Sequence, residues 1–138
     1  MIIMKFGGTS VGTAERFLRV ANLIQSKIAK QPVVVVSAVG GITNLLLQAG
    51  EESLRLEPSI SKQEELPTSL KKIYKIHDEI LKSLHLDTEF FQKFYAELSE
   101  IYKGISLLKE FTPRARDLVS SYGVGQGDVL HPVPLGTF

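Results

Sequence analysis

The sequence contains no cysteine, which excludes a disulfide, a thiol nucleophile and a thiolate metal site. Its 16 basic and 15 acidic residues leave a formal charge of +1, so there is no electrostatic reason to expect nucleic acid or an anionic membrane as a partner. The longest apolar run, around Val33 to Val36, is far too short to cross a bilayer, and the N-terminus does not read as a secretory signal. These absences predict a cytoplasmic protein that binds neither nucleic acid nor membrane.

The first part of the chain predicts a strand, a helix and a second strand. Ile2 to Phe6 is apolar without alternation, which is typical of a strand buried on both faces. Ala14 to Lys27 carries apolar residues at helical spacing, and Thr13 stands at its N-cap. Pro32 then opens the β-branched run Val33 to Val36, as in a central parallel strand. Because a crossover helix joins parallel strands, both following loops should lie at the edge where open α/β sheets bind ligands.

The next part of the chain predicts helices. One begins at Ile42 and ends near Leu54, where a polar connection follows. Two apolar stripes come next, from Leu70 to Leu84 and from Phe91 to Leu108. A length of 138 residues, of which 43% are apolar, suits one domain with a core or part of a larger one. We therefore expect an α/β fold in which an antiparallel helical hairpin lies beside a parallel sheet.

The end of the chain changes character. Thr112 and Pro113 supply an N-cap and a first residue for another helix, which should end near Gly123. Residues 124–138 contain several glycines and prolines without helical or strand periodicity, so we expect an irregular tail. The glycines of residues 123–127 imitate a nucleotide-binding loop, but they follow a helix rather than a strand and do not predict one.

Aromatic and histidine residues in the helices suggest no further site. The stripe of Phe91, Phe94 and Tyr102 has the spacing of core packing. The histidines show no metal-ligand spacing: His77 and His85 lie in or just after a polar-faced helix, and His131 lies in the tail. We expect neither group to bind a ligand.

The stretch from Lys5 to Ser10 is the strongest candidate for chemistry. It places a cation, two glycines and two hydroxyls at the turn from the first strand to the first helix, which is a plausible cradle for an anion. Its spacing is neither that of a P-loop nor that of a dinucleotide-binding loop. From the pattern alone, Lys5 could also be a strand-end lysine that reaches solvent, and Gly7-Gly8 an ordinary turn.

Three segments together resemble the aspartate kinases. Lys5-Phe6-Gly7-Gly8-Thr9-Ser10-Val11 resembles their N-terminal signature, and Val35 to Ala38 followed by Gly41 to Asn44 resembles their second loop. Ile105 to Leu108 through Ser121-Tyr122-Gly123 resembles the approach to their third motif. The resemblance covers residues 1–123, which would be the N-terminal part of the catalytic domain. It implies an incomplete amino-acid kinase fold, a three-layer α/β/α sandwich.

The resemblance also implies a reaction and a site. Such enzymes transfer the γ-phosphoryl group of ATP to the β-carboxylate of L-aspartate, which is the first step of lysine, threonine and methionine biosynthesis. Lys5 would be catalytic, and the residues that handle ATP phosphates would be Lys5, Gly7, Gly8, Thr9 and Ser10. Aspartate would be held by Ser37, Ala38 and Thr43. Without the resemblance, the hydroxyls of Ser37 and Thr43 would be read as helix caps.

The cofactors implied are ATP and Mg²⁺. Magnesium would accompany ATP because the triphosphate charge must be neutralised, although no carboxylate of the sequence is an evident ligand. The acceptor carboxylate is already ionised at neutral pH, so no general base is needed. This agrees with glycine loops that contain neither histidine nor aspartate.

The resemblance stops inside the third motif. Val124 stands where the family has a substrate-binding glutamate, and the family's later residues do not follow. A frameshift or truncated reading frame would explain this break, and we expect the chain to be inactive alone. The alternative is a non-catalytic fragment that binds a small anion or another chain. The parent family is oligomeric, whereas this chain should expose apolar surface and unpaired strand edges, which would favour aggregation.

Overall fold

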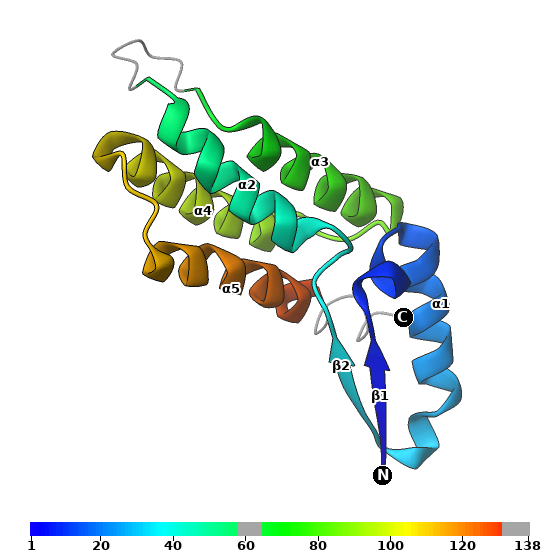
Figure 1. Cartoon of the computed structure of the whole chain (residues 1–138). Helices are drawn as coiled ribbons and strands as arrows, with labels where there is room; N and C mark the ends of the chain where they lie inside the picture. The colour runs from blue at the N-terminus through cyan, green and yellow to red at the C-terminus, as the bar shows by residue number, and fades with distance from the viewer. Residues whose placement is uncertain (58–64, 131–138) are drawn as a thin grey trace.

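The computed structural model describes the backbone of residues 1–57 and 65–130, together with the side chains of residues 1–57 and 65–123. Over these residues, a small parallel sheet and its crossover helix lie at one end of a bundle of four helices (Figure 1). The elements in chain order are β1 (Ile2–Phe6), the 3-10 helix η1 (Gly8–Val11), α1 (Ala14–Ser26), the 3-10 helix η2 (Ile28–Lys30), β2 (Pro32–Val36), α2 (Ile42–Arg55), α3 (Thr68–Ser83), α4 (Glu89–Leu108) and α5 (Pro113–Leu130). This arrangement is the incomplete α/β architecture that the sequence predicts.

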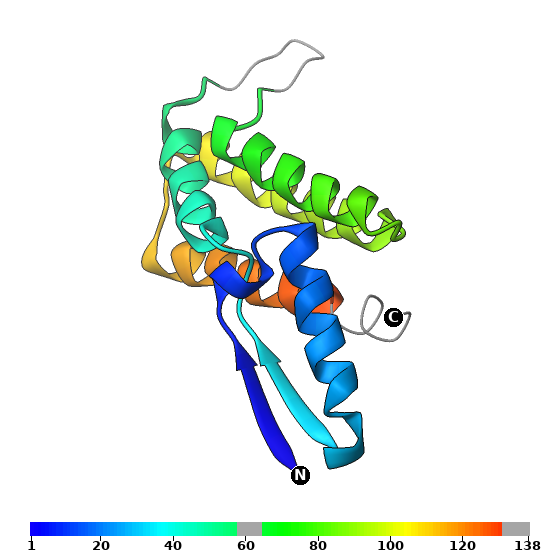
Figure 2. The ribbon, with the colours of Figure 1, turned by 90° about the vertical axis from the view of Figure 1, so that its right-hand side faces the viewer.

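The sheet and α1 form a β-α-β unit. β1 and β2 pair in parallel, as predicted, and Lys5 lies opposite Val35. α1 joins them and packs on one face of the sheet (Figure 2). Its buried stripe consists of Phe17, Val20, Ala21 and Ile24. Thr13 caps the helix as expected, because its side chain accepts a hydrogen bond from the backbone N–H of Arg16.

The prediction that the strands are buried on both faces is wrong for the described residues. Both strands alternate between more and less buried positions, so that only one face of the sheet packs on the core. Ile3 is 72% exposed on the open face, and Val33 and Val35 are each 46% exposed. An apolar sequence shows that a strand can be buried, but it does not show whether another layer covers each face. The expected exposed apolar surface is thereby confirmed.

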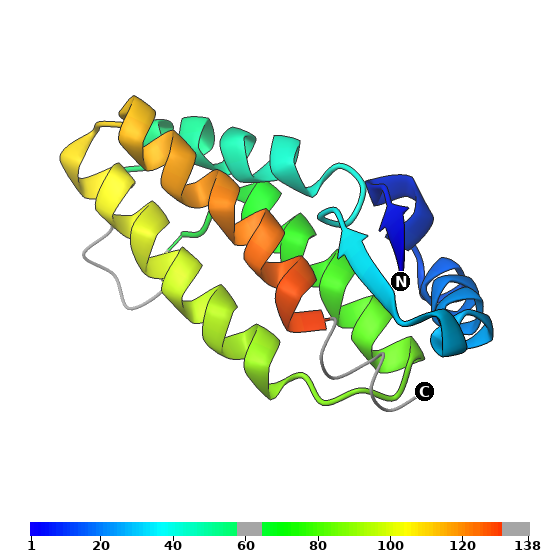
Figure 3. The ribbon, with the colours of Figure 1, turned by 90° about the horizontal axis from the view of Figure 1, so that it is seen from below.

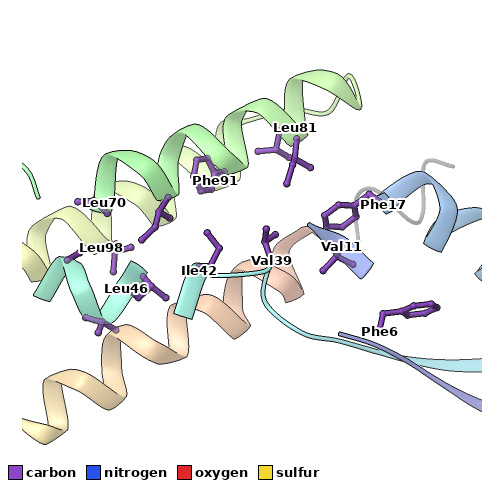
Figure 4. Packing of buried hydrophobic residues seen from close by; sticks show 14 of the residues in the cluster. Phe6, Val11, Phe17, Val39, Ile42, Leu46, Leu70, Leu81, Phe91 and Leu98 are labelled. Carbon is purple, nitrogen blue, oxygen red and sulfur yellow. The ribbon is translucent and has the colours of Figure 1, made fainter. Parts of the chain in front are cut away.

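The four helices of the bundle share one core with the sheet. α3 and α4 form the predicted antiparallel hairpin, and α2 and α5 pack against it (Figure 3). Buried side chains continue from the bundle into the β-α-β unit through Val39 and Ile42 (Figure 4). The Tyr102 hydroxyl donates a 2.6 Å hydrogen bond to the carbonyl of Leu46, which ties α4 to α2. Phe91 and Tyr102 are buried as predicted, whereas Phe94 is half-buried. No helix of the described residues is long and apolar enough to cross a membrane.

α5 is longer than the sequence predicts. Thr112 caps it as expected, by accepting a hydrogen bond from the N–H of Ala115, but the helix ends at Leu130 rather than near Gly123. Glycine costs a helix about 1 kcal/mol relative to alanine without forbidding it, and no proline occurs between Pro113 and Pro132. Residues 124–130 are therefore helical, which corrects the expected irregular tail there. Residues 131–138, with His131, lie outside the described residues, and a domain division at residue 123 stays a prediction.

His77 is buried rather than placed on a polar helix face. Only 1% of it is exposed, and its ring stacks on Phe91 with centroids 5.0 Å apart. Its Nδ1 lies 2.9 Å from the carbonyl oxygen of Ile73. A carbonyl can only accept, so Nδ1 carries the proton of the neutral ring. Burial lowers the pKa of His77 below its usual 6.5, and the bond to Ile73 opposes this shift only in part.

Acidification should therefore destabilise the fold through His77. Because the pKa is lower in the folded chain, the unfolded chain holds more protons once the pH falls below 6.5. The free energy of unfolding should decline as the pH falls through 6.5, and the substitution His77→Leu should reduce this decline. Urea denaturation at several pH values measures it. The matched control is His85→Asn at the exposed histidine; an equal reduction by the control would refute the assignment.

Gly50 of α2 lies against the ring of Phe111. A Cβ built on Gly50 would overlap this ring. Gly50 meets the edge of the ring, whereas the Arg116 guanidinium lies over its face, 4.5 Å from the ring centroid, and pairs with Glu51. The contact between Gly50 and Phe111 thus joins α2 to the segment that leads into α5.

The substitution Gly50→Ala should lower the free energy of unfolding by about 1 kcal/mol. Overpacking costs about 1–3 kcal/mol, which exceeds the gain of roughly 1 kcal/mol that alanine brings to a helix interior. In a Phe111→Ala background the overlap is gone, so the same substitution should stabilise the protein by about 1 kcal/mol. Urea denaturation of the four proteins tests this reversal of sign, and a loss of stability in both backgrounds would contradict it.

Candidate functional site

The first candidate loop leaves the C-terminal end of β1. Lys5 and Phe6 point to opposite sides of the sheet, because successive side chains of a strand alternate. Phe6 is buried on the α1 side, whereas Lys5 is exposed on the open face. Gly7 continues in extended backbone, and η1 then turns the chain back toward α1, with the N–H of Ser10 bonded to the Gly7 carbonyl at 3.0 Å. The strand thus presents the Lys5 amine on the side that α1 does not cover.

The second candidate loop leaves β2 beside the first. The N–H of Gly40 donates a 3.0 Å hydrogen bond to the carbonyl of Gly8. A Cβ on Gly8 would lie 2.9 Å from the carbonyl oxygen of Ala38 and 3.1 Å from the Gly40 Cα. Only glycine at position 8 allows the two backbones to approach this closely. The prediction that both loops lie at one edge of the sheet is therefore confirmed.

The hydroxyls of the second loop do not cap the helix that follows. α2 begins at Ile42 after Gly41, whose φ of +83° favours glycine, and no side chain caps its N-terminus. The capping interpretation of Ser37 and Thr43 is thus wrong. Ser37 instead extends the sheet by one residue, because its N–H donates to the Phe6 carbonyl at 3.0 Å.

The polar groups of both loops are uncommitted. Within residues 1–57 and 65–123, the side chains that make no hydrogen bond or ion pair with the protein include Lys5, Thr9, Ser10, Ser37 and Thr43. The hydroxyls of Thr13 and Thr112, by contrast, are bonded as helix caps. Five uncommitted donors at the ends of two neighbouring strands are available to a ligand.

A third segment reaches the same place. A Cβ on Gly123 of α5 would lie 3.4 Å from the Ala38 Cβ and 3.6 Å from the Thr43 hydroxyl. The end of α5 accordingly lies beside the loop between β2 and α2 (Figure 1). The Tyr122 hydroxyl donates a 3.4 Å hydrogen bond to the Glu97 carboxylate. Burial, and to a lesser extent this carboxylate, raise the pKa of Tyr122, so its phenol is neutral at physiological pH. The third segment that resembles the aspartate kinases therefore meets the second.

The charge at the site is positive. Lys5 is the only ionisable side chain in residues 5–13 and 37–44. No group of three or more histidine, aspartate or glutamate side chains that could hold a metal ion occurs in the described part of the chain. The arrangement suits a ligand that brings negative charge, and it provides fixed backbone and hydroxyl donors rather than a proton-transfer group.

Two contributors to the site could not be recognised from the sequence. Gly40 supports the first loop from the second, and Arg16 supports it from α1, where its Nη1 donates a 2.7 Å hydrogen bond to the carbonyl of Thr9. The Gly40-Gly41 pair marks the end of the second strand in the sequence. The contact of Gly40 with Gly8, however, depends on how the sheet brings the two loops together. Nothing in the helical pattern around Arg16 distinguishes it from a solvated arginine.

The comparison with known proteins agrees with this architecture. Residues 1–116 match the sequence model of the amino acid kinase family, so the chain belongs to this family. The relatives described next are aspartokinases, which confirms the resemblance found in the three segments. It is 40% identical over 121 residues to Aspartokinase 1, chloroplastic, of Arabidopsis thaliana, covering 88% of this chain and 21% of that protein. It is 41% identical over 122 residues to Aspartokinase 2, chloroplastic, of the same plant, covering 88% and 22%.

Solved structures give the same answer. E. coli aspartokinase III, crystallised in complex with aspartate and ADP, superposes with a TM-score of 0.76 at 28% identity, covering 98% of this chain and 28% of that one. The aspartate kinase of Clostridium acetobutylicum shares the fold, with a TM-score of 0.71 at 22% identity over 99% of this chain and 29% of its own. The chain spans about a fifth of the length of the curated relatives that it matches.

Proposed function

We propose that this chain contributes the aspartate and phosphate loops of an aspartate kinase, which transfers the γ-phosphoryl group of ATP to the β-carboxylate of L-aspartate. The observation that carries the proposal is the junction of the two loops. Gly8 and Gly40 hold them in backbone contact, and Gly123 closes against the second loop. The E. coli relative was crystallised with aspartate and ADP, which are the substrate and product that this reaction requires.

Each loop has a distinct task in this proposal. The Lys5 ammonium neutralises charge that develops on the transferred phosphoryl group, and Gly7 and Gly8 let the phosphates approach the backbone, with the hydroxyls of Thr9 and Ser10 beside them. Mg²⁺ enters with ATP as part of the substrate, held by phosphate oxygens. Positioning and charge stabilisation account for most of the catalysis of such a transfer, so the lack of a general base in the loops is no obstacle.

The second loop holds the acceptor. Ser37 and Thr43 have hydroxyls that make no hydrogen bond within the described residues, and the Ala38 carbonyl oxygen lies against Gly8. An ionised β-carboxylate held there attacks the γ-phosphorus directly, and ADP leaves without a proton being removed from the acceptor. A cytoplasmic location and a role in amino-acid biosynthesis accompany this proposal as predictions.

Turnover by this chain alone is not expected. Val124 stands where the aspartate kinases have a substrate-binding glutamate, and valine offers no carboxylate. A carboxylate at this position would offer an acceptor to the ammonium group of aspartate, which valine cannot. We therefore expect ATP- and aspartate-dependent hydroxamate formation to be absent from the wild-type chain.

The substitution Val124→Glu should strengthen L-aspartate binding. A charge-assisted hydrogen bond contributes roughly 1.5–3 kcal/mol, which corresponds to about a tenfold gain or more. Titration calorimetry of wild type, Val124→Glu and the uncharged control Val124→Gln measures the gain. The proposal for position 124 is contradicted if Val124→Glu and Val124→Gln have the same affinity for L-aspartate, or if neither affinity differs from that of the wild type.

A second candidate function is a non-catalytic module that docks on another chain. The open apolar face of Ile3, Val33 and Val35 favours it. This alternative gains support if Val124→Glu leaves aspartate binding unchanged and the wild-type chain shows no affinity for MgATP.

A further inference from the structure

A hollow of about 410 Å³ lies on the other side of β1 from Lys5, between the first loop and α1. Its apolar wall is formed by Phe6, Val20 and Leu23, and its polar rim by Thr9, Ser10, Arg16 and Arg19. Phe6 and Lys5 point to opposite faces of the sheet, so the hollow is separate from the surface on which the Lys5 amine lies. A volume of this size falls within the range of small-molecule sites.

The two arginines of the rim each donate one hydrogen bond within the described residues and keep most of their donors. Each guanidinium has five N–H donors. Arg16 uses one on the Thr9 carbonyl at 2.7 Å, and Arg19 uses one on the Glu15 carboxylate at 2.8 Å. The Arg19 and Glu15 side chains are 74% and 76% exposed, so their pair is weak and easily exchanged. The rim therefore offers cationic N–H donors to a ligand, and Arg19 can leave Glu15 with little loss of free energy.

We propose that this hollow binds a phosphate monoester that carries a compact apolar body. A tetrahedral phosphate can accept from two guanidinium groups and from the hydroxyls of Thr9 and Ser10, which make no hydrogen bond within the described residues. The apolar body lies against Val20 and Leu23, where 46% of the Leu23 side chain is otherwise exposed. This site shares Thr9 and Ser10 with the proposed kinase site, but neither Lys5 nor the second loop lines it, so the two sites can be tested separately.

The effect of Glu15 on phosphate affinity distinguishes this proposal from simple attraction by net charge. Its carboxylate competes with the bound phosphate for Arg19, so its removal should strengthen binding, whereas removal of Arg19 should weaken it. A hollow that merely attracts anions by net charge would respond to any arginine on the surface. Arg55 at the end of α2 is exposed and makes no hydrogen bond or ion pair within the described residues, so it supplies the matched control.

The test is titration calorimetry with phenyl phosphate and with inorganic phosphate. We expect Arg19→Gln to weaken both ligands by about tenfold. Glu15→Gln should tighten both, and Leu23→Ser should weaken phenyl phosphate alone. Arg55→Gln should leave both affinities unchanged, and Lys5→Gln should weaken phosphate binding less than Arg19→Gln does.

Three results would overturn the site: no binding of phenyl phosphate to the wild type, equal losses in Arg19→Gln and Arg55→Gln, or a loss in Glu15→Gln. A loss in Lys5→Gln as large as that in Arg19→Gln would also overturn it, because the ligand would then occupy the proposed kinase site. Tighter binding of inorganic phosphate than of phenyl phosphate would show that the apolar wall does not contribute to binding.

Discussion

Gly8→Ala is expected to lower the free energy of unfolding by about 2 kcal/mol, because overpacking a close contact costs about 1–3 kcal/mol. The added Cβ would lie 2.9 Å from the Ala38 carbonyl oxygen, and also within 3.2 Å of both Gly40 Cα and Gly40 N. These are backbone atoms that a side-chain rotation cannot move aside. Relief requires the two loops to separate, which also breaks the hydrogen bond from Gly40 to Gly8.

The neighbouring glycine provides a matched control. Gly7 has a φ of −78° and no atom within 4 Å of a built Cβ, so alanine fits there without strain. Gly7→Ala should change stability by less than about 0.5 kcal/mol, as is usual for a surface substitution. Urea denaturation compares the two variants, and equal losses would mean that the contact between the loops is not what requires glycine at position 8.

Lys5→Gln is expected to weaken MgATP binding by about tenfold or more, since a hydrogen bond to a charged group contributes about 1.5–3 kcal/mol. Stability should hardly change, because the Lys5 side chain is exposed and makes no bond with the described residues. Fluorescence or calorimetric titration measures the affinity.

The control for this variant is Lys72→Gln, at an exposed lysine of α3. It removes the same charge from another part of the surface, so it should leave the MgATP affinity unchanged. Equal losses in the two variants would show that Lys5 acts only through net charge and holds no phosphate.

The elements that could be predicted from the sequence are those fixed by local chemistry. Thr13 and Thr112 precede helical patterns with the right side chain for a cap, and both cap their helices. The β-branched run before Ser37 and the glycines after it define a strand end with few alternatives. The crossover helix makes the two strands parallel, and parallel strands end at the same edge of the sheet, so both loops lie there.

The features that could not be predicted depend on what packs against a residue. His77 appears polar in sequence, but Phe91 from the next helix covers it. The open face of the sheet follows from the absence of a covering layer in the described residues, which an apolar strand cannot reveal. The contact of Gly123 with Ala38 joins residues 85 positions apart, and no local pattern encodes such a distance.

The most direct test of a single two-loop site is an NMR titration of the ¹⁵N-labelled chain with MgATP. If the loops form one phosphate-handling site, the amide signals of Gly7 and Gly8 should shift, and that of Gly40 should follow because it donates to the Gly8 carbonyl. In Lys5→Gln, the same shifts should require about tenfold more MgATP, as expected for the loss of one charged hydrogen bond. Shifts confined to α1 around Arg19, or shifts of Gly7 and Gly8 with the same MgATP dependence in Lys5→Gln as in the wild type, would contradict the proposed site.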